Sequence, residues 1–362
     1  MPGKTARSSN LELLRILCML LIIGDHLTGQ SGIADYTTLP SSFAFCLIGC
    51  GSRIACSVFI LIGGWFLCEQ PYRARRPLSL WLSLWLYTVP VTLLCRLGGL
   101  DVSLGALRWA LFPASTRQLW FISDYLLLLL CVPLLNRLLH GLPRAAHRGV
   151  LAVLAVPLLV YPTLFAENGL TGDTAWMFLY EYLLIAYLRR YPDNRLTRLL
   201  QRRCAALLLG LGLPLVNTAV RAVLEMRGLT DGKAFQYIAY YRTALGALPN
   251  LLAALALFYL FKGLSLGSVR WINALSGTTL GVYILHQIPA SRGFLWNGIL
   301  QAQAHHGSVG YTLFAVAAVF FGCAAVDAAR TALVMHPLEK TKLFRTLCEK
   351  GDALAAKITA DD

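Results

Sequence analysis

Ten apolar stretches recur along this chain, and each is close to the length that crosses a lipid bilayer. A helix needs about 20 consecutive apolar residues to span the hydrocarbon core. Because a backbone inside lipid must satisfy its own hydrogen bonds, we expect all ten stretches to be helical. The sequence therefore predicts an all-α integral membrane protein with about ten transmembrane helices. The stretches cover residues 11–28, 43–67, 78–96, 119–138, 149–165, 174–188, 204–222, 243–261, 271–290 and 309–335.

The composition excludes an ordinary soluble protein. Of the 362 residues, 57% are hydrophobic and only 14% are charged. In soluble domains, about a quarter of all residues are charged. Polar and basic residues precede the first apolar stretch, and no small-residue cleavage site follows it. We interpret this stretch as a retained first transmembrane helix. The ten cysteines lie mostly inside apolar stretches without paired spacing, so we expect packing residues and not disulfides or ligands.

Lysine and arginine are distributed unevenly between the two sides of the predicted bundle. If the N-terminus is cytoplasmic, 22 of the 32 basic residues fall on the inside and eight in outside loops. Cytoplasmic loops collect such residues, so the distribution predicts a cytoplasmic N-terminus and C-terminus. The same bias explains the net charge of +14 better than a nucleic-acid partner does, and no nucleic acid is expected.

A single ten-helix transmembrane domain, residues 1–338, is expected to account for most of the chain. A short, charged, amphipathic tail, residues 339–362, is expected to follow it on the cytoplasmic side. The outside loop of about 97–118 is longer than the others and contains LGALRWALF. We expect this segment to form a short interfacial helix with Trp109 at the level of the lipid headgroups.

The first apolar stretch carries ionisable residues at a depth where they are costly. It reads NLELLRILCMLLIIGDH over Asn10–His26, and ionisable groups at membrane depth usually mark a functional site. Arg15 and His26 are eleven residues apart, so they project from one helix face roughly 16 Å apart. Glu12 and Arg15 are spaced to pair, so a structural ion pair is the alternative interpretation of these two residues.

His26 is suited to acid–base chemistry, because a neutral imidazole near pH 7 can take a proton from a hydroxyl group and return it. Asp25 adjoins it, but successive helical residues do not face each other, so a carboxylate of another helix is the alternative orienting group. Asp124, about one turn into the fourth helix, is a candidate, with interfacial solvation as the alternative. His286 ends the ninth helix and is expected at the same depth as His26. No third ligand is evident at typical spacing, so no metal site is predicted.

Together with His286 and Asp124, three further residues are candidate contacts to a substrate or to an oxyanion that forms during a reaction. Arg53 lies in an apolar stretch and keeps its charge, so it must meet an anion, backbone carbonyls or water. Snorkelling to the outer surface is the alternative for Arg53. Trp120 suits an interfacial aromatic belt, and Tyr283 precedes His286 on the ninth helix. Gly63 and Gly64 permit close approach of another helix or a ligand.

Four segments together resemble the acyltransferase-3 family of integral membrane enzymes, which O-acylate bacterial surface carbohydrates. The resemblance covers the chain in order. Glu12 stands where aspartate is commoner, Ile60 replaces one of two phenylalanines, and Gly63 occupies the position of a usual serine. We expect these differences to affect substrate identity more than reaction class. The four segments are ELLRILCMLLIIGDH (12–26), RIACSVFILIGGWFL (53–67), LWFISDYLLLLLCVPLLN (119–136) and LSGTTLGVYILH (275–286).

The resemblance implies transfer of an acetyl group from cytoplasmic acetyl-CoA to a hydroxyl of a cell-surface or lipid-linked saccharide, at the bacterial cytoplasmic (inner) membrane. His26 would act as general base or as transient acyl carrier, with Arg15, Glu12 and Asp25 in the same catalytic set. Acyl-CoA would be a donor substrate, and no permanently bound cofactor is expected. Basic inner segments are expected to dock its phosphates, above all Arg73, Arg75, Arg76 and the run 189–203. Arg15 is also expected to contact the donor.

Two other classes of protein remain as alternatives. A transporter or flippase of a lipid-linked sugar would also have many helices and intramembrane charges, but two related halves with broken helices are not evident in the sequence. A sensor or membrane partner without catalysis would leave the alignment of Arg15 with His26 unexplained.

Overall fold

The structure is a computed structural model that describes residues 9–172 and 174–359. In these ranges the chain forms helices joined by turns, without any strand, so the prediction of an all-α protein is confirmed. The first half contains α1 Ser9–Gln30, α2 Leu39–Ile48, α3 Ser52–Leu67, α4 Arg75–Leu97, α5 Leu104–Leu111, α6 Trp120–Gly141, α7 Arg144–Ala155, α8 Tyr161–Phe165 and α9 Thr174–Arg190. The second half contains α10 Arg195–Leu200, α11 Arg203–Leu207, α12 Leu213–Met226, α13 Lys233–Thr243, α14 Leu248–Lys262, α15 Arg270–Gln287, α16 Pro289–Gly293, α17 Val309–Arg330, α18 His336–Lys340 and α19 Lys342–Thr359.

Several long helices are continued by single π-helical turns. Such turns insert a residue into the α-helical repeat and often lie near functional sites. Here they join α7 to α8, α11 to α12, and α17 to α18, and one follows α16. Their bounds are Val156–Val160, Leu208–Gly212, Thr331–Met335 and Phe294–Ile299, and two 3₁₀ turns lie at Gly169–Gly172 and Ala302–His305.

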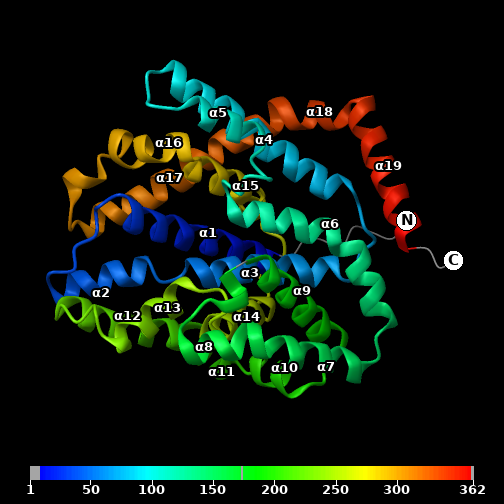
Figure 1. Cartoon of the computed structure of the whole chain (residues 1–362), viewed down its shortest axis with the longest axis horizontal. Helices are drawn as coiled ribbons and strands as arrows, with labels where there is room; N and C mark the ends of the chain where they lie inside the picture. Colours follow the sequence, from blue (N-terminus) through cyan, green and yellow to red (C-terminus); the bar gives the residue numbers. More distant parts are fainter. Residues whose placement is uncertain (1–8, 173, 360–362) are drawn as a thin grey trace.

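Helices α1 and α3 lie side by side at the centre of the bundle (Figure 1). Helices α15 and α17 pack on one flank of α1, while α9 and α14 pack against α3. Buried apolar side chains fill this interior, among them Leu14, Ile23, Leu61 and Phe258. The two central helices therefore hold their side chains within protein, and the outer helices supply the surface.

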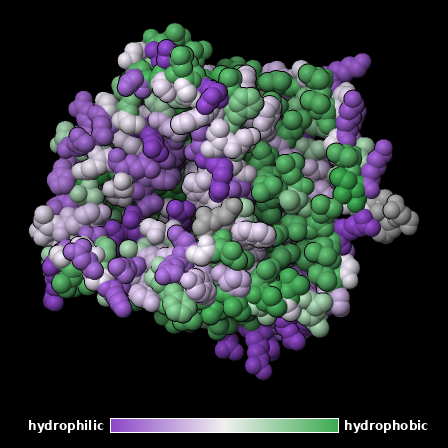
Figure 2. Space-filling view, in the orientation of Figure 1, coloured by the Kyte–Doolittle hydropathy of each residue, from purple (hydrophilic) through white to green (hydrophobic). Residues whose placement is uncertain are grey.

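Seven helical runs within the described residues are long and apolar enough to cross a membrane. Large apolar side chains are exposed on the outer helices, including Leu94, Val153, Leu208 and Phe321. Figure 2 shows hydrophobic side chains gathered over α6, between polar side chains on the side of α16 and a polar rim along α19. Exposed apolar surface of this extent is typical of contact with lipid. The seven runs are Leu39–Leu67, Arg75–Leu97, Trp120–Gly141, Arg144–Phe165, Arg203–Met226, Lys233–Lys262 and Val309–Lys340.

The three other expected segments are also helical, as α1, α9 and α15, but they are not among these seven runs. The expected total of ten membrane crossings therefore stays a prediction, as does the cytoplasmic position of both chain ends. Two expected segments are interrupted: residues 49–51 separate α2 from α3, and residues 244–247 separate α13 from α14.

Two predictions outside the bundle can also be compared with the structure. The expected interfacial segment forms α5, capped by the Ser103 hydroxyl, and Trp109 is exposed on it. The expected tail continues as α19, which packs against α6. Residues 1–8 and 360–362 of the predicted domain and tail lie outside the described residues.

One glycine allows α15 to approach α17 closely. A Cβ atom at Gly281 would lie 2.1 Å from Oδ1 of Asp327. The Asp327 carboxylate cannot move away freely, because it accepts a hydrogen bond of 2.5 Å from the Tyr87 hydroxyl and forms a 3.0 Å ion pair with Arg330. Gly281 therefore sets the position of the half of α15 that carries Tyr283 and His286.

We predict that Gly281→Ala lowers the free energy of unfolding by about 1–3 kcal/mol, the usual cost of forcing extra volume into a packed interior. Thermal unfolding of the purified protein in detergent measures the change. Gly277→Ala is the matched control on the same helix, because nothing lies within 4 Å of its added Cβ atom. Equal melting temperatures for the two variants would contradict the packing argument.

Candidate active site

A polar cavity of about 360 Å³ surrounds the C-terminal end of α1. We call it the His26 cavity. The ends or beginnings of α1, α3, α6, α13, α15 and α16 contribute to its lining. Of the residues predicted from the sequence, this cavity brings together Asp25, His26, Arg53, Trp120 and Tyr283.

His26 and His286 are directly hydrogen-bonded. Nδ1 of His26 lies 2.9 Å from Nε2 of His286, and Nδ1 of His286 lies 2.6 Å from the Val282 carbonyl oxygen. The expectation that the two histidines lie at one depth is thus confirmed. His286 is fully buried behind His26, whereas His26 is partly exposed and lines the cavity.

This geometry fixes the neutral tautomers of both imidazoles. A carbonyl oxygen only accepts hydrogen bonds, so Nδ1 of His286 must carry the proton. Nε2 of His286 is then an acceptor, and Nδ1 of His26 must donate to it. The lone pair of His26 therefore resides on Nε2, which receives no hydrogen bond from the described residues. The pair presents a base toward the cavity.

Asp25 turns away from His26 and pairs with an arginine of α13. Its Oδ1 lies 2.5 Å from Nη2 of Arg242, whose Nε donates to the Gly49 carbonyl oxygen at 2.9 Å. That carbonyl is available because the chain is not helical at residues 49–51. Gly49 itself is needed there, because a Cβ atom would lie 2.9 Å from Oγ1 of Thr28 and 3.0 Å from Nη2 of Arg242.

Arg53 projects into the His26 cavity and does not snorkel away from it. Its guanidinium carbon lies 4.8 Å from the centre of the Trp120 ring, a cation–π contact. Arg292, at the end of α16, lines the same cavity and is exposed. Both guanidinium groups therefore share this cavity with His26.

A second, mostly apolar cavity of about 270 Å³ lies further back along α1, beside Arg15. We call it the Arg15 cavity. It shares Ile22 and Tyr283 with the His26 cavity, so these two side chains stand between the cavities. Because α1 is helical throughout Ser9–Gln30, Arg15 and His26 are separated by roughly 16 Å along its axis.

The ion pair expected from the spacing of Glu12 and Arg15 is confirmed. Nη1 of Arg15 lies 2.8 Å and 2.9 Å from the two carboxylate oxygens of Glu12. Glu12 is buried, and one of its oxygens also accepts a hydrogen bond from the Ser276 hydroxyl of α15. The pair holds the Arg15 guanidinium at the edge of the Arg15 cavity.

The glycine that replaces a usual serine also lines the Arg15 cavity. A Cβ atom at Gly63 would lie 2.9 Å from the Tyr125 hydroxyl oxygen. The Tyr125 hydroxyl thus reaches into space that a side chain at position 63 would need. The missing side chain at Gly63 on α3 and the phenol of Tyr125 on α6 are therefore physically linked in this chain.

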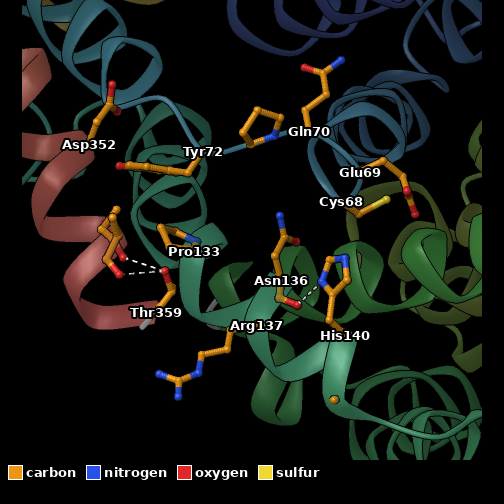
Figure 3. A pocket seen from close by; sticks show the side chains of 14 residues that line it. Cys68, Glu69, Gln70, Tyr72, Pro133, Asn136, Arg137, His140, Asp352 and Thr359 are labelled. Carbon is orange, nitrogen blue, oxygen red and sulfur yellow. Dashed lines mark hydrogen bonds between the residues drawn. The ribbon is translucent and has the colours of Figure 1, made fainter. Parts of the chain in front are cut away.

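The arginines expected to dock a donor lie at the other end of α3: Arg73 precedes α4, and Arg75 and Arg76 begin it. Arg75 forms a 2.5 Å ion pair with Glu339 of α18, Arg76 donates to Gln70, and Arg73 is exposed. Beside them is a cavity of about 810 Å³, which we call the tail cavity. Figure 3 shows its side chains coming from the α3–α4 loop, the end of α6 and α19.

Asp124 pairs with side chains other than the two histidines. Its carboxylate forms a 3.0 Å ion pair with Arg117 and accepts a hydrogen bond from the Thr174 hydroxyl. Its contacts thus connect the start of α6 to the start of α9. The nitrogen atom that orients the His26 imidazole belongs to His286, and Asp25 pairs with Arg242.

Sequence reasoning did not single out Arg242, Arg292 or Gln118, although all three line the His26 cavity. In the sequence, Arg242 and Arg292 belong to the eight basic residues of the expected outside loops. The sequence pattern that indicates them is an arginine directly beside a break in an apolar segment, as at Arg242, which precedes residues 244–247.

Comparison with known proteins gives one match. A family model described as an acyltransferase domain matches residues 8–328. Among curated proteins and solved structures, none matches the chain.

We predict that Asp25 and Arg242 stabilise the protein as a pair. Both side chains are about four-fifths buried, with 22% and 19% exposed, so a coupling of about 1–2 kcal/mol is expected, between surface and buried pairs. A double-mutant cycle with Asp25→Asn and Arg242→Gln measures it from unfolding free energies. The exposed pair of Arg144 and Asp193 is the control and should couple more weakly. Additive effects at Asp25 and Arg242 would contradict the assignment.

Proposed function

This chain belongs to the acyltransferase-3 family, and we propose that it transfers an acetyl group from cytoplasmic acetyl-CoA to a hydroxyl of a cell-surface or lipid-linked saccharide. The observation that carries the proposal is the hydrogen-bonded pair of His26 and His286, which leaves Nε2 of His26 as a base facing a polar cavity. General-base assistance is what a hydroxyl group needs to attack a thioester.

The proposed topology has ten membrane crossings with both ends in the cytoplasm, in the inner membrane of a bacterium. Helices at all ten apolar segments and the unequal distribution of basic residues support it. The apolar field between the polar side chains near α16 and those along α19 is consistent with the same direction of crossing (Figure 2). The His26 cavity then faces outward, and the start of α4 with Arg73, Arg75 and Arg76 faces the cytoplasm.

The donor enters from the cytoplasmic side in this mechanism. The anionic nucleotide part of acetyl-CoA binds Arg73, Arg75 and Arg76 at the start of α4, because guanidinium groups pair well with phosphate. The thin pantetheine arm lies in the mostly apolar Arg15 cavity. Arg15, held by Glu12, contacts the donor at the edge of that cavity. Acyl-CoA is a substrate here, and the step requires no permanently bound cofactor.

The acceptor hydroxyl is activated in the His26 cavity. Nε2 of His26 takes the hydroxyl proton as the oxygen attacks the thioester carbonyl, which forms a C–O bond and a tetrahedral oxyanion. Collapse of this intermediate breaks the C–S bond, and the CoA thiolate takes the proton from the imidazolium. Throughout the reaction, Nε2 of His286 accepts the hydrogen bond from Nδ1–H of His26. This contact stabilises the imidazolium, so we assign His286 as a positioning residue.

Two further roles belong to the same proposal. Arg53 orients the acceptor or stabilises the oxyanion, because its charge is permanent and it lines the cavity. In the alternative chemical route, the same Nε2 lone pair attacks the thioester first, and His26 carries the acetyl group before the acceptor hydroxyl takes it. The matched family is one of acyltransferases, which does not favour a transporter or flippase.

We predict that His26→Ala lowers turnover by about 10²–10⁴-fold, the usual contribution of a general base. His286→Phe should also lower kcat strongly, since it removes the acceptor for Nδ1 of His26. His286→Gln should retain more activity, because its amide oxygen can accept that hydrogen bond. Release of CoA thiol is measured in liposomes with acetyl-CoA, with and without a glycan acceptor. Undiminished turnover in His26→Ala would exclude the catalytic assignment.

The donor-docking arginines are tested separately. Arg75→Glu and Arg76→Glu together should raise the apparent KM for acetyl-CoA about tenfold or more, because two phosphate-binding charges become repulsive. Arg148→Glu makes the same kind of change at an exposed arginine of α7, a helix that packs against α9, and should leave this KM unchanged. An unchanged KM in the double variant would remove Arg75 and Arg76 from the donor site.

A further inference from the structure

We propose that the acceptor saccharide carries a negative charge, a carboxylate or a phosphate group, which Arg53 and Arg292 bind in the His26 cavity. This inference rests on the proposed function and extends it by naming the class of acceptor. The proposed function requires only a hydroxyl group on the acceptor, so an additional anionic group is a separate requirement.

The charges of the cavity lining do not balance. Three arginines line the cavity, Arg53, Arg242 and Arg292, but Asp25 is the one carboxylate among the lining residues. Asp25 and Arg242 form a 2.5 Å ion pair, so their charges compensate each other. Because both histidines are neutral in the tautomers derived above, the described lining retains two uncompensated positive charges, on Arg53 and Arg292.

The guanidinium groups of Arg53 and Arg292 differ in exposure, although both line the cavity. Arg53 is half-buried and stacked on the Trp120 ring, a contact that leaves its charge uncompensated and its N–H groups available. Arg292 is exposed at the end of α16. Neither forms an ion pair within residues 9–172 and 174–359. A partly buried guanidinium without a counter-ion is costly, and an anionic ligand removes that cost.

Polar groups suited to a sugar accompany these charges. Oε1 of Gln118 is buried in the cavity lining and accepts no hydrogen bond from the described residues. Such an orphaned acceptor fits a sugar hydroxyl donor. The Gln30 and Gln287 amides and the Trp120 ring also line the cavity. Its volume of about 360 Å³ lies within the range of small-molecule sites.

The anion that these arginines bind is not expected to be the donor. The phosphates of acetyl-CoA are assigned to Arg73, Arg75 and Arg76 at the start of α4, at the other end of α3. An oxyanion exists only during the reaction and needs donors at the reacting carbonyl, whereas Arg292 sits at the exposed edge of the cavity. A permanent charge on the acceptor explains both arginines.

The experiment compares three soluble acceptors in the liposome assay with acetyl-CoA. Methyl glucoside is neutral, methyl glucuronoside adds a carboxylate, and glucose 1-phosphate adds a phosphate. We expect kcat/KM at least about tenfold higher for one of the two anionic acceptors, and the two arms identify which anion is preferred. Arg53→Gln and Arg292→Gln should each lower the ratio of anionic to neutral kcat/KM, mainly through KM. Arg292→Lys should restore most of this ratio.

Arg227→Gln is the matched control, since it removes the same charge from an exposed arginine outside the cavity lining. It should leave the ratio unchanged. Equal efficiency with all three acceptors, or equal losses with neutral and anionic acceptors in both arginine variants, would overturn the inference. If no acceptor supports release of CoA thiol, the proposed function fails. Thermal stabilisation by the glucuronoside or the phosphate, relative to the glucoside, then still tests the anion site in wild type and Arg292→Gln.

Discussion

The hydrogen bond between Nδ1 of His26 and Nε2 of His286 is the interaction on which the candidate site depends. It joins the ends of α1 and α15, two helices that are separated by most of the sequence. The Val282 carbonyl behind His286 determines which nitrogen atoms carry protons, and so it determines that Nε2 of His26 faces the cavity as a base. A single backbone acceptor on α15 thereby controls the chemistry of a side chain on α1.

Interruptions of the helices make this arrangement possible. The break at residues 49–51 exposes the Gly49 carbonyl, and the break after α13 lets Arg242 reach both that carbonyl and Asp25. Asp25 thereby forms its ion pair with Arg242 and not with His26. The close approach of α15 to α17 at Gly281 then fixes the half of α15 on which Tyr283 and His286 lie. The site is built from helix ends and breaks more than from helix interiors.

Local features of the fold and the site followed from the sequence. The spacing of Glu12 and Arg15 predicted their ion pair, the apolar stretches predicted the helices, and the polar ends of two helices predicted His26 and His286 at one depth. The partner of Asp25 did not follow, because Arg242 lies 217 residues away and helical periodicity carries no information on that distance. For the same reason the sequence left Asp124 as a candidate partner of His26, whereas tertiary packing pairs it with Arg117.

Ile22 and Tyr283 line both the Arg15 cavity and the His26 cavity. If these cavities open to opposite sides of the membrane, the two side chains are also the seal between the compartments. An enzyme that passes an acetyl group across a bilayer has to do so without letting protons and ions follow their gradients. The phenol of Tyr283 and the branched side chain of Ile22 suit that task. A thin, uncharged acyl thioester can pass between them, whereas a hydrated ion is too large and too polar to pass. Energy conservation in the cell would then depend on the same two residues as acyl transfer.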